Sequence, residues 1–429
     1  MTPELPPGFR KLPSAERRAF WEGTLLADDD EREAAAAGDG AFTLADLMVE
    51  NAVGVLPLPL GVATGFLIDG SEMAVPLAVE EPSVVAAASH AARIVAAGGG
   101  FSTEADGSVM EGYVYLEGVD AAGEARLSGP EGRAELEAAV RKGQASLEKR
   151  GGGYRGLEVG RLPATGLVAL SISIDVRDAM GANLLNTAAE AARPVAERLS
   201  GGRALMCILS NDSPRRLARA RFALPFAALG PFARGLSAAE AARRVALACD
   251  LADEDPRRAV THNKGVMNGI ASLAQATMND TRAVEAAAHA WASRSGRLRP
   301  LTAYRAEGEV LHGSIELPLA LGTVGGSVDL HPAARAALRL LGNPDSRGLA
   351  RIAAALGLAQ NFAALLALVS GGIQGGHMRL HATRLAYKAG ARGDEPRQAA
   401  ELMAADGEWT AAAAAKALAA LRAGNGGDR

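Results

Sequence analysis

The chain has 429 residues, a length that predicts two or three domains rather than one hydrophobic core. Apolar residues make up 48% and charged residues 22% of it, which is the composition of a soluble globular protein. The formal net charge of -4 gives no electrostatic basis for nucleic-acid binding. The short basic cluster at residues 215–219 has no interleaved aromatic residues, and we expect it to be a solvated face.

The compartment follows from what the sequence lacks. MTPELPPGFRKLPSAERR has prolines and charges where a signal peptide needs an apolar core. No apolar run approaches the roughly 20 residues of a membrane span. Cys207 and Cys249 have no metal-type spacing, so we expect buried free thiols in a reducing cytosol. We therefore expect a cytoplasmic protein with no membrane partner.

The first 106 residues predict the beginning of a large domain. Residues 1–30 form a charged, proline-bearing arm that leads into a helix. Val, Leu, Pro and Gly alternate over residues 50–69, a pattern that favours strands and turns. Residues 83–97 predict a strong helix that Ser83 can cap, and GGGFST then interrupts the chain.

Residues 107–214 predict a separate domain. The expected elements are a strand at 113–119, a helix at 133–149, a strand pair within 157–176, a helix after Gly181 and a strand at 205–209. This β-α-β-β-α-β order is typical of a ferredoxin-like insert. Residues 215–371 return to a mostly helical domain with one strand at 310–319. SGGIQGGHM opens a small helical unit on a hinge, which makes 372–429 the last domain of an α+β fold.

Two glycine-bearing segments are candidates for phosphate binding. Gly151, Gly153 and Gly156 match G-x-G-x-x-G, but they follow a helix and lead into a strand, the reverse of the dinucleotide-binding order, so we reject them. In IDVRDAMGAN a strand leads through Gly181 into a helix whose N-terminus offers free N–H groups to a pyrophosphate. A plain strand-to-helix turn explains this pattern equally well.

Several ionisable residues stand in unusual settings. Lys264 lies in a long stretch of small and amide residues in which the next acid is Asp280. Glu81 precedes a helix, where a carboxylate either stabilises the helix dipole or donates a proton. His377 and His381 share one helical face beside the glycine-rich hinge. Without a third ligand they predict no metal site, and they are either structural or, at the hinge, a mobile acid.

Seven segments in order resemble the class II, bacterial-type hydroxymethylglutaryl-CoA reductases. They are ENAVG (50–54), PLGVATGF (59–66), EEPSVVAA (80–87), DVRDAMGAN (175–183), THNKGVMNG (261–269), ND-RAVEA (279–286) and GIQGGHMRLHA (372–382). The resemblance covers nearly the whole chain. It implies a large, mostly helical CoA-ester-binding domain, an inserted ferredoxin-like (non-Rossmann) nicotinamide-binding domain and a C-terminal flap. It also implies reduction of hydroxymethylglutaryl-CoA to mevalonate and CoA, or the reverse, by two hydride transfers with NAD(H) or NADP(H) and no metal.

The resemblance also implies site residues. The catalytic set is Glu81, Lys264, Asp280 and His377, with a buried Lys264 ammonium stabilising the oxyanion and His377 protonating the CoA thiolate. The residues implied to bind substrate are Arg10, Glu50, Asn51, Ser83, Arg258, Thr261 and Asn361, with Arg258 gripping the free carboxylate. Those implied to line the cofactor site are Asp178, Met180, Gly181, Asn183 and Asn211. A homodimer with active sites at the subunit interface, assembled further in some members, is implied as well.

The chain departs from the family pattern at three places. Met278 replaces a glycine before the Asn-Asp pair, Gly375 replaces a basic hinge residue, and the segment Arg141–Gln144 lacks the acid that accepts NAD ribose hydroxyls. The last departure predicts that NADP is at least tolerated, with Gln144 still able to bond a hydroxyl. Two rival hypotheses remain: a CoA-thioester lyase or hydrolase, and a CoA-binding assembly subunit without catalysis.

Overall fold

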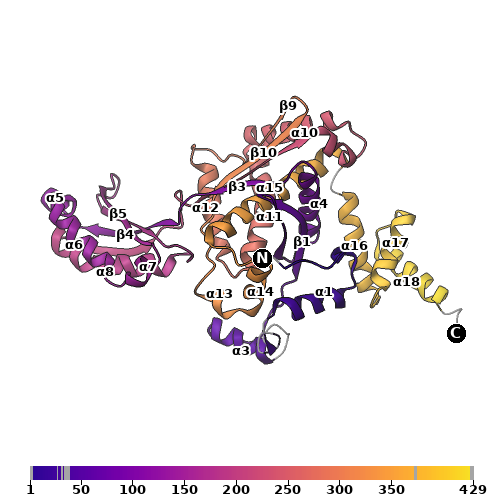
Figure 1. The fold of residues 1–429 in the computed structure, drawn as a ribbon, viewed down its shortest axis with the longest axis horizontal. Helices are drawn as coiled ribbons and strands as arrows, with labels where there is room; N and C mark the ends of the chain where they lie inside the picture. Colours follow the sequence, from indigo (N-terminus) through magenta and orange to yellow (C-terminus); the bar gives the residue numbers. More distant parts are fainter. Residues whose placement is uncertain (1–2, 27, 30–31, 33–38, 372–373, 426–429) are drawn as a thin grey trace.

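The computed structural model describes residues 3–26, 28–29, 32, 39–371 and 374–425. The molecule is elongated, with a sheet-containing unit at one end, a large central unit, and a helical C-terminal unit at the other end (Figure 1). The N-terminal arm leads into helix, as predicted; its described elements are η1 (Phe9–Lys11), α1 (Ser14–Phe20) and η2 (Trp21–Leu25), and α3 (Asp39–Met48) comes later. Leu25 and Leu26 anchor it by packing against Ala336 and Leu340 of the central unit.

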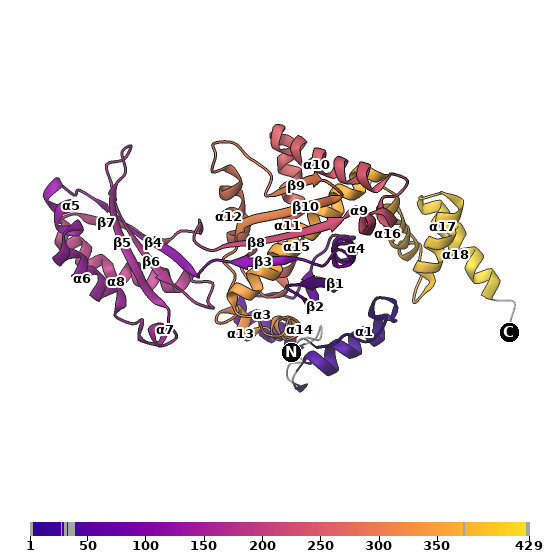
Figure 2. The same cartoon turned by 45° about the horizontal axis from the view of Figure 1, so that its top comes forward.

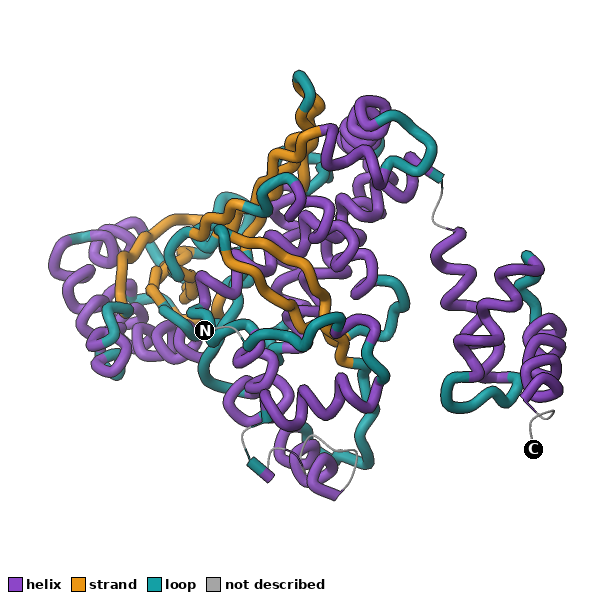
Figure 3. Tube along the Cα trace, turned by 45° about the vertical axis from the view of Figure 1, so that its right-hand side comes forward, coloured by secondary structure: helices purple, strands orange, loops and turns teal. Residues whose placement is uncertain are grey.

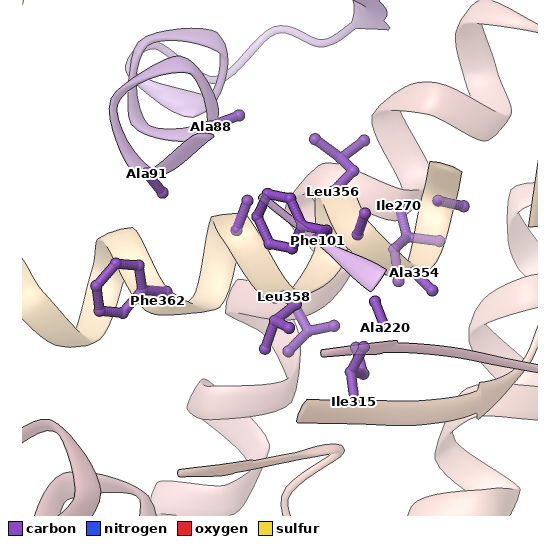
Figure 4. Close-up of a cluster of buried hydrophobic side chains, with 14 of the residues drawn as sticks. Ala88, Ala91, Phe101, Ala220, Ile270, Ile315, Ala354, Leu356, Leu358 and Phe362 are labelled. Carbon is purple, nitrogen blue, oxygen red and sulfur yellow. The ribbon is translucent and has the colours of Figure 1, made fainter. Parts of the chain in front are cut away.

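The central unit is built around one long helix, α15 (Ser346–Ser370). By length and apolar composition this helix could cross a membrane, contrary to the expectation of no such run, but 78% of its most apolar window is buried inside the protein. Leu356 and Phe362 lie among Phe101 and Ile270 from neighbouring elements (Figure 4). The helix therefore forms the core of the unit.

Helices and two sheets surround α15 (Figure 2). The strands are β1 (Leu60–Ile68) and β2 (Ser71–Ala78) in an antiparallel pair, and β3 (Ser102–Ala105), β8 (Leu217–Pro225), β10 (Val310–Pro318) and β9 (Thr302–Glu307) in that spatial order. The helices are α4 (Val84–Ala97), α9 (Phe226–Leu229), η3 (Gly230–Phe232), α10 (Ala238–Glu254), α11 (Pro256–Ala276), α12 (Thr281–Ser293), α13 (Ser327–Leu330) and α14 (Pro332–Leu340).

The four-stranded sheet of this unit corrects the sequence prediction, which placed one strand in residues 215–371. The prediction of β10 is confirmed, but β8 and β9 were missed. Arg219 and Arg221 alternate along β8 with the buried Ala218, Ala220 and Phe222, and alanines gave too weak an apolar signal to reveal the period of two.

The unit at the other end confirms the ferredoxin-like prediction. Its antiparallel sheet has the order β5-β6-β4-β7, made of β4 (Val109–Glu117), β5 (Gly153–Arg161), β6 (Val168–Asp175) and β7 (Arg203–Leu209). Its helices are α5 (Ala121–Ser128), α6 (Pro130–Arg141), α7 (Ala145–Lys149) and α8 (Ala182–Ser200). The single helix predicted at 133–149 is broken in two because Gly143 has a φ of 103°.

The C-terminal unit comprises α16 (Gln374–Lys388), α17 (Glu395–Asp406) and α18 (Ala411–Asn425). It has its own small core, in which Ala386, Ala399 and Met403 are buried, and it stands beside the central unit (Figure 3). Of the two cysteines, Cys249 is buried as expected, whereas Cys207 is only half-buried.

Candidate active site

Helix α11 positions the candidate catalytic residue Lys264 and two of the candidate substrate-binding residues, Arg258 and Thr261. Asp255 caps it by accepting a hydrogen bond from Arg257 N at 2.9 Å, and Pro256 occupies the first turn, where no backbone donor is needed. Glycines let α11 lie close against α15, since a Cβ on Gly357 would stand 2.6 Å from Ile270. This close packing fixes the helix that carries Arg258, Thr261 and Lys264.

Lys264 and Glu81 form an ion pair. The ammonium Nζ of Lys264 donates to Glu81 Oε2 at 2.7 Å, joining α11 to the turn before α4. The two side chains are 59% and 38% exposed, so the expectation of a buried ammonium is wrong for the single chain. The surrounding residues are indeed small, but they leave the pair open to solvent. Glu81 lies outside the first turn of α4, which is free of acidic residues, and its partner is Lys264 rather than the helix end.

Ser83 lies two residues after Glu81 in a strained conformation. Its φ of 80° is left-handed, a region that costs free energy for any residue with a Cβ. The predicted cap is wrong: the side chain makes no capping hydrogen bond at the start of α4. Its hydroxyl is instead buried without a partner, which leaves a polar atom available to a ligand beside the ion pair.

Asp280 is held by the turn that ends α11. Met278 N bonds Gln275 O at 3.1 Å and Asn279 N bonds Ala274 O at 2.8 Å, the pattern of a helix terminus that places its next residue in the left-handed region. Met278 occupies that position with a φ of 51°. A glycine would adopt this conformation without strain, whereas the Cβ of Met278 strains the turn.

The Asp280 carboxylate faces α12 in this structure. It accepts from Ala283 N at 3.0 Å as the helix cap, and Arg282 lies 3.6 Å away. Among the described residues no ion pair joins it to Lys264. Asn279, one residue earlier, bonds both N and O of Gly322 at 2.7 and 3.0 Å, tying this turn to the loop after β10.

The implied substrate residues are divided between the surface and the core. Arg258 is half-buried, and Thr261 is exposed on α11. Asn361 is 1% exposed, and both ends of its amide are engaged by protein groups. Glu50 and Asn51 are exposed in the turn after α3. Arg10 lies in η1, but its side chain is outside the described residues.

The predicted phosphate turn lies between β6 and α8, as expected. Gly181 has a φ of 113°, and a Cβ there would stand 2.9 Å from Met110 Sδ, so only glycine fits. The Asp178 carboxylate accepts from Ser346 N at 3.0 Å, which ties the turn to the start of α15. Met180 is half-buried; Asn183, in the first turn of α8, and Asn211, after β7, are exposed.

Arg216 holds the same turn, although the sequence analysis placed it on a solvated face. It is 4% exposed and donates to Met180 O at 3.0 Å and Leu321 O at 2.8 Å. Burial lowers its pKa to about 10, partly offset by Asp175 and Asp178. The sequence signal for this was the pair of apolar residues that follows Arg216: Leu217 and Ala218 are both buried and begin strand β8. This guanidinium joins the ferredoxin-like unit to the central one.

The segment 141–144, which was expected to meet the cofactor ribose, contains one arginine that is already paired with acids. Arg141 is not free to bind a phosphate, because Glu137 and Glu148 pair with it. Lys142 is exposed. Gln144 is 7% exposed, and its Oε1 is buried without a partner, so it retains an acceptor for a hydroxyl.

His377 lies in α16, but its side chain is outside the described residues. His381, one turn later on the same helix, is exposed. The backbone of the hinge is described only in part, because residues 372–373 are also outside the described range.

Comparisons with known proteins agree with this arrangement. The model of the family described as hydroxymethylglutaryl-coenzyme A reductase matches residues 14–382. The chain is 42% identical over 405 residues to 3-hydroxy-3-methylglutaryl-coenzyme A reductase of Archaeoglobus fulgidus, covering 94% of this chain and 91% of that protein. It is 36% identical over 347 residues to a probable reductase of the same name from Borreliella burgdorferi, covering 79% and 78%.

Solved structures give the same result. The reductase from Streptococcus pneumoniae matches with a TM-score of 0.79 at 39% identity, covering 97% of this chain and 99% of that one. The class II enzyme of that organism, bound to NADPH in open conformations, matches with a TM-score of 0.78 at 40% identity, covering 85% and 99%. The lyase and assembly-subunit alternatives find no support in these matches. The chain belongs to the hydroxymethylglutaryl-coenzyme A reductase family, whose members are oxidoreductases.

Proposed function

We propose that the chain interconverts hydroxymethylglutaryl-CoA and mevalonate plus CoA at the Lys264–Glu81 pair. The observation that supports this most is the 2.7 Å contact itself, which sets an ammonium beside a carboxylate, with the unpartnered hydroxyl of Ser83 two residues further along the chain. A thioester carbonyl that receives hydride becomes an oxyanion, and a fixed ammonium stabilises that charge. Glu81 shares a proton with Lys264 and can pass it to the oxygen.

Asp280 and His377 complete the proposed catalytic set. Asp280 turns from its cap on α12 toward Lys264 when substrate closes the site. His377, carried by α16 of the C-terminal unit, protonates the departing CoA thiolate so that it does not add back to the aldehyde. The nicotinamide cofactor supplies the hydride, and the rest of the chemistry belongs to these side chains.

Substrate binding is proposed to extend from α11 to the N-terminal arm. Arg258 and Thr261 hold the hydroxymethylglutaryl group, with Ser83 and Asn361 beside them. Arg10, Glu50 and Asn51 lie along CoA. This division would assign residues 1–106 and 215–371 to the substrate domain, 107–214 to the cofactor domain and 372–429 to the flap.

The cofactor is proposed to bind at the N-terminus of α8. Free N–H groups there meet the pyrophosphate, with Asp178, Met180, Gly181, Asn183 and Asn211 around it. We propose that both NADH and NADPH are used. Lys142 is exposed to meet a 2′-phosphate and Gln144 can accept from a ribose hydroxyl, while Arg141 is occupied by two acids.

The active unit is proposed to be a cytoplasmic homodimer, which can serve as the building block of a higher oligomer. Val53 and Leu56 are 99% and 95% exposed beside Glu50 and Asn51, an apolar stretch that a second copy would cover. Sedimentation at micromolar concentration should give a dimer, and a strict monomer with full activity would refute the shared site.

A coupled assay tests the function directly. The purified chain should oxidise NADH or NADPH only when hydroxymethylglutaryl-CoA is present, releasing free CoA thiol and mevalonate. Release of the thiol without cofactor oxidation would mean a hydrolase, and tight CoA-ester binding without turnover would mean an assembly subunit.

A further inference from the structure

A buried polar network lies behind the candidate substrate residues of α11. His262, between Thr261 and Lys264, is 1% exposed, and its Nε2 lies 2.6 Å from Thr302 Oγ1 on β9. Thr302 Oγ1 donates to Asn361 Oδ1 at 3.0 Å, and Tyr304 OH donates to the same oxygen at 3.0 Å. Asn361 Nδ2 donates back to the carbonyl of His262 at 3.3 Å.

The network fixes the tautomer of His262. The Asn361 amide must point its oxygen at Thr302 and Tyr304, because its nitrogen bonds a carbonyl. Thr302 has one hydroxyl hydrogen, which goes to Asn361, so its oxygen accepts from His262 Nε2–H. Burial lowers the pKa of His262 to about 4, with the charge of Arg258 contributing, so the ring is neutral and its Nδ1 carries only a lone pair.

That lone pair has no donor in this structure. His262 Nδ1 is buried without a hydrogen-bond partner, which costs free energy in this conformation. Such an atom is explained if it gains a donor in another conformation of the enzyme. Arg258 lies four residues earlier, on the same face of α11. Within the described part of the chain its guanidinium makes no hydrogen bond or ion pair, although its positive charge helps to lower the pKa of His262.

We propose that His262 is a positioning residue of the reaction: its Nδ1 accepts a hydrogen bond from Arg258 when that guanidinium turns to bind the free carboxylate of the substrate. A guanidinium has five N–H donors, so one bond to Nδ1 leaves a two-pronged face for the carboxylate. The proposal deepens the proposed function and rests on the role of Arg258 given there. It assigns Thr302, Tyr304 and Asn361 to holding the imidazole in the accepting tautomer.

Two amide variants separate the two ring nitrogens. His262→Gln places its amide near Nε2, keeping the contact with Thr302 while removing the acceptor. His262→Asn places its amide near Nδ1 and keeps the acceptor. We expect His262→Gln to weaken binding of 3-hydroxy-3-methylglutarate by roughly 10- to 150-fold, the effect of one hydrogen bond to a charged group, without changing the affinity for CoA. His262→Asn should recover most of the loss, and KM for the thioester should rise with kcat little changed.

A double-mutant cycle with Arg258→Ala tests the route of the effect. If His262 acts through Arg258, adding His262→Gln to Arg258→Ala should cause no further loss of diacid affinity. A full additional loss, or no loss in His262→Gln alone while Arg258→Ala weakens binding, would overturn the inference and leave the role of Arg258 intact. Unchanged affinity in Arg258→Ala would instead refute the proposed role of Arg258 itself.

The wild-type protein gives a test that does not depend on a variant folding. In ¹⁵N-histidine spectra, one ring should show the Nε2–H tautomer at neutral pH. Its Nδ1 resonance should shift on addition of 3-hydroxy-3-methylglutarate and stay in place on addition of CoA. An Nδ1–H tautomer, or an Nδ1 resonance unmoved by the diacid, would contradict the inference.

Discussion

Replacing Lys264 by alanine should separate stability from catalysis. The ion pair with Glu81 is short, at 2.7 Å, but its side chains are 59% and 38% exposed. Water screens such a pair, so we expect its removal to change the free energy of unfolding by only about 0–1 kcal/mol. The ammonium facing the developing oxyanion has a larger effect on the transition state. Its loss should slow thioester reduction by roughly 100- to 1,000-fold, or about 2.7–4 kcal/mol.

The assay pairs urea unfolding with cofactor oxidation measured at saturating hydroxymethylglutaryl-CoA. Arg257→Ala is the matched control, because Arg257 lies on the same helix, is 95% exposed and pairs with Asp255 at 3.5 Å. It should leave both stability and turnover unchanged. Near-native turnover in Lys264→Ala would refute the reasoning, and so would an equal loss of turnover in the Arg257 variant.

Three further changes test other parts of the site. His377→Gln should slow thioester reduction by about 10²- to 10⁴-fold but reduction of added mevaldehyde far less, since mevaldehyde has no thiolate to protonate, and His381→Gln should be tolerated; equal damage to both half-reactions would indicate a structural histidine. Met278→Gly should be neutral or stabilising in urea unfolding and Met278→Val destabilising by about 1–2 kcal/mol, because a β-branched residue resists a φ of 51°; a valine variant as stable as the glycine variant would contradict the strain. Lys142→Glu should lower kcat/KM for NADPH about fivefold to tenfold relative to NADH, whereas Lys149→Glu should not; an unchanged ratio would remove Lys142 from the phosphate site.

Sequence patterns were most informative where local chemistry and fold agree. The order of elements between residues 107 and 214 predicted the ferredoxin-like topology because strand and helix periods alternate clearly there. Gly181 was correctly placed between a strand and a helix, and its φ of 113° explains the residue type.

The sequence predictions that were wrong concern residues whose environment is set by long-range contacts. The basic cluster at 215–219 looked solvated, yet Arg216 finds backbone carbonyls more than 30 residues away in sequence at Met180 and Leu321. Serine is a residue type that often caps helices, and Ser83 stands at the start of α4. In the structure its φ is left-handed, and its hydroxyl makes no capping hydrogen bond. No local pattern could show either result, because tertiary packing decides both.

Isotope transfer tests the central claim, two successive hydride transfers to one carbon at the Lys264 site. Hydroxymethylglutaryl-CoA is incubated with NADPH or NADH carrying deuterium at the transferable position, and mevalonate is analysed by mass spectrometry. The account predicts two deuterium atoms on the carbon that carried the thioester, and labelling by Lys264→Ala that is roughly 100- to 1,000-fold slower. Free diacid without deuterium, a product with one deuterium that is not reduced further, or full labelling by the Lys264 variant would contradict it.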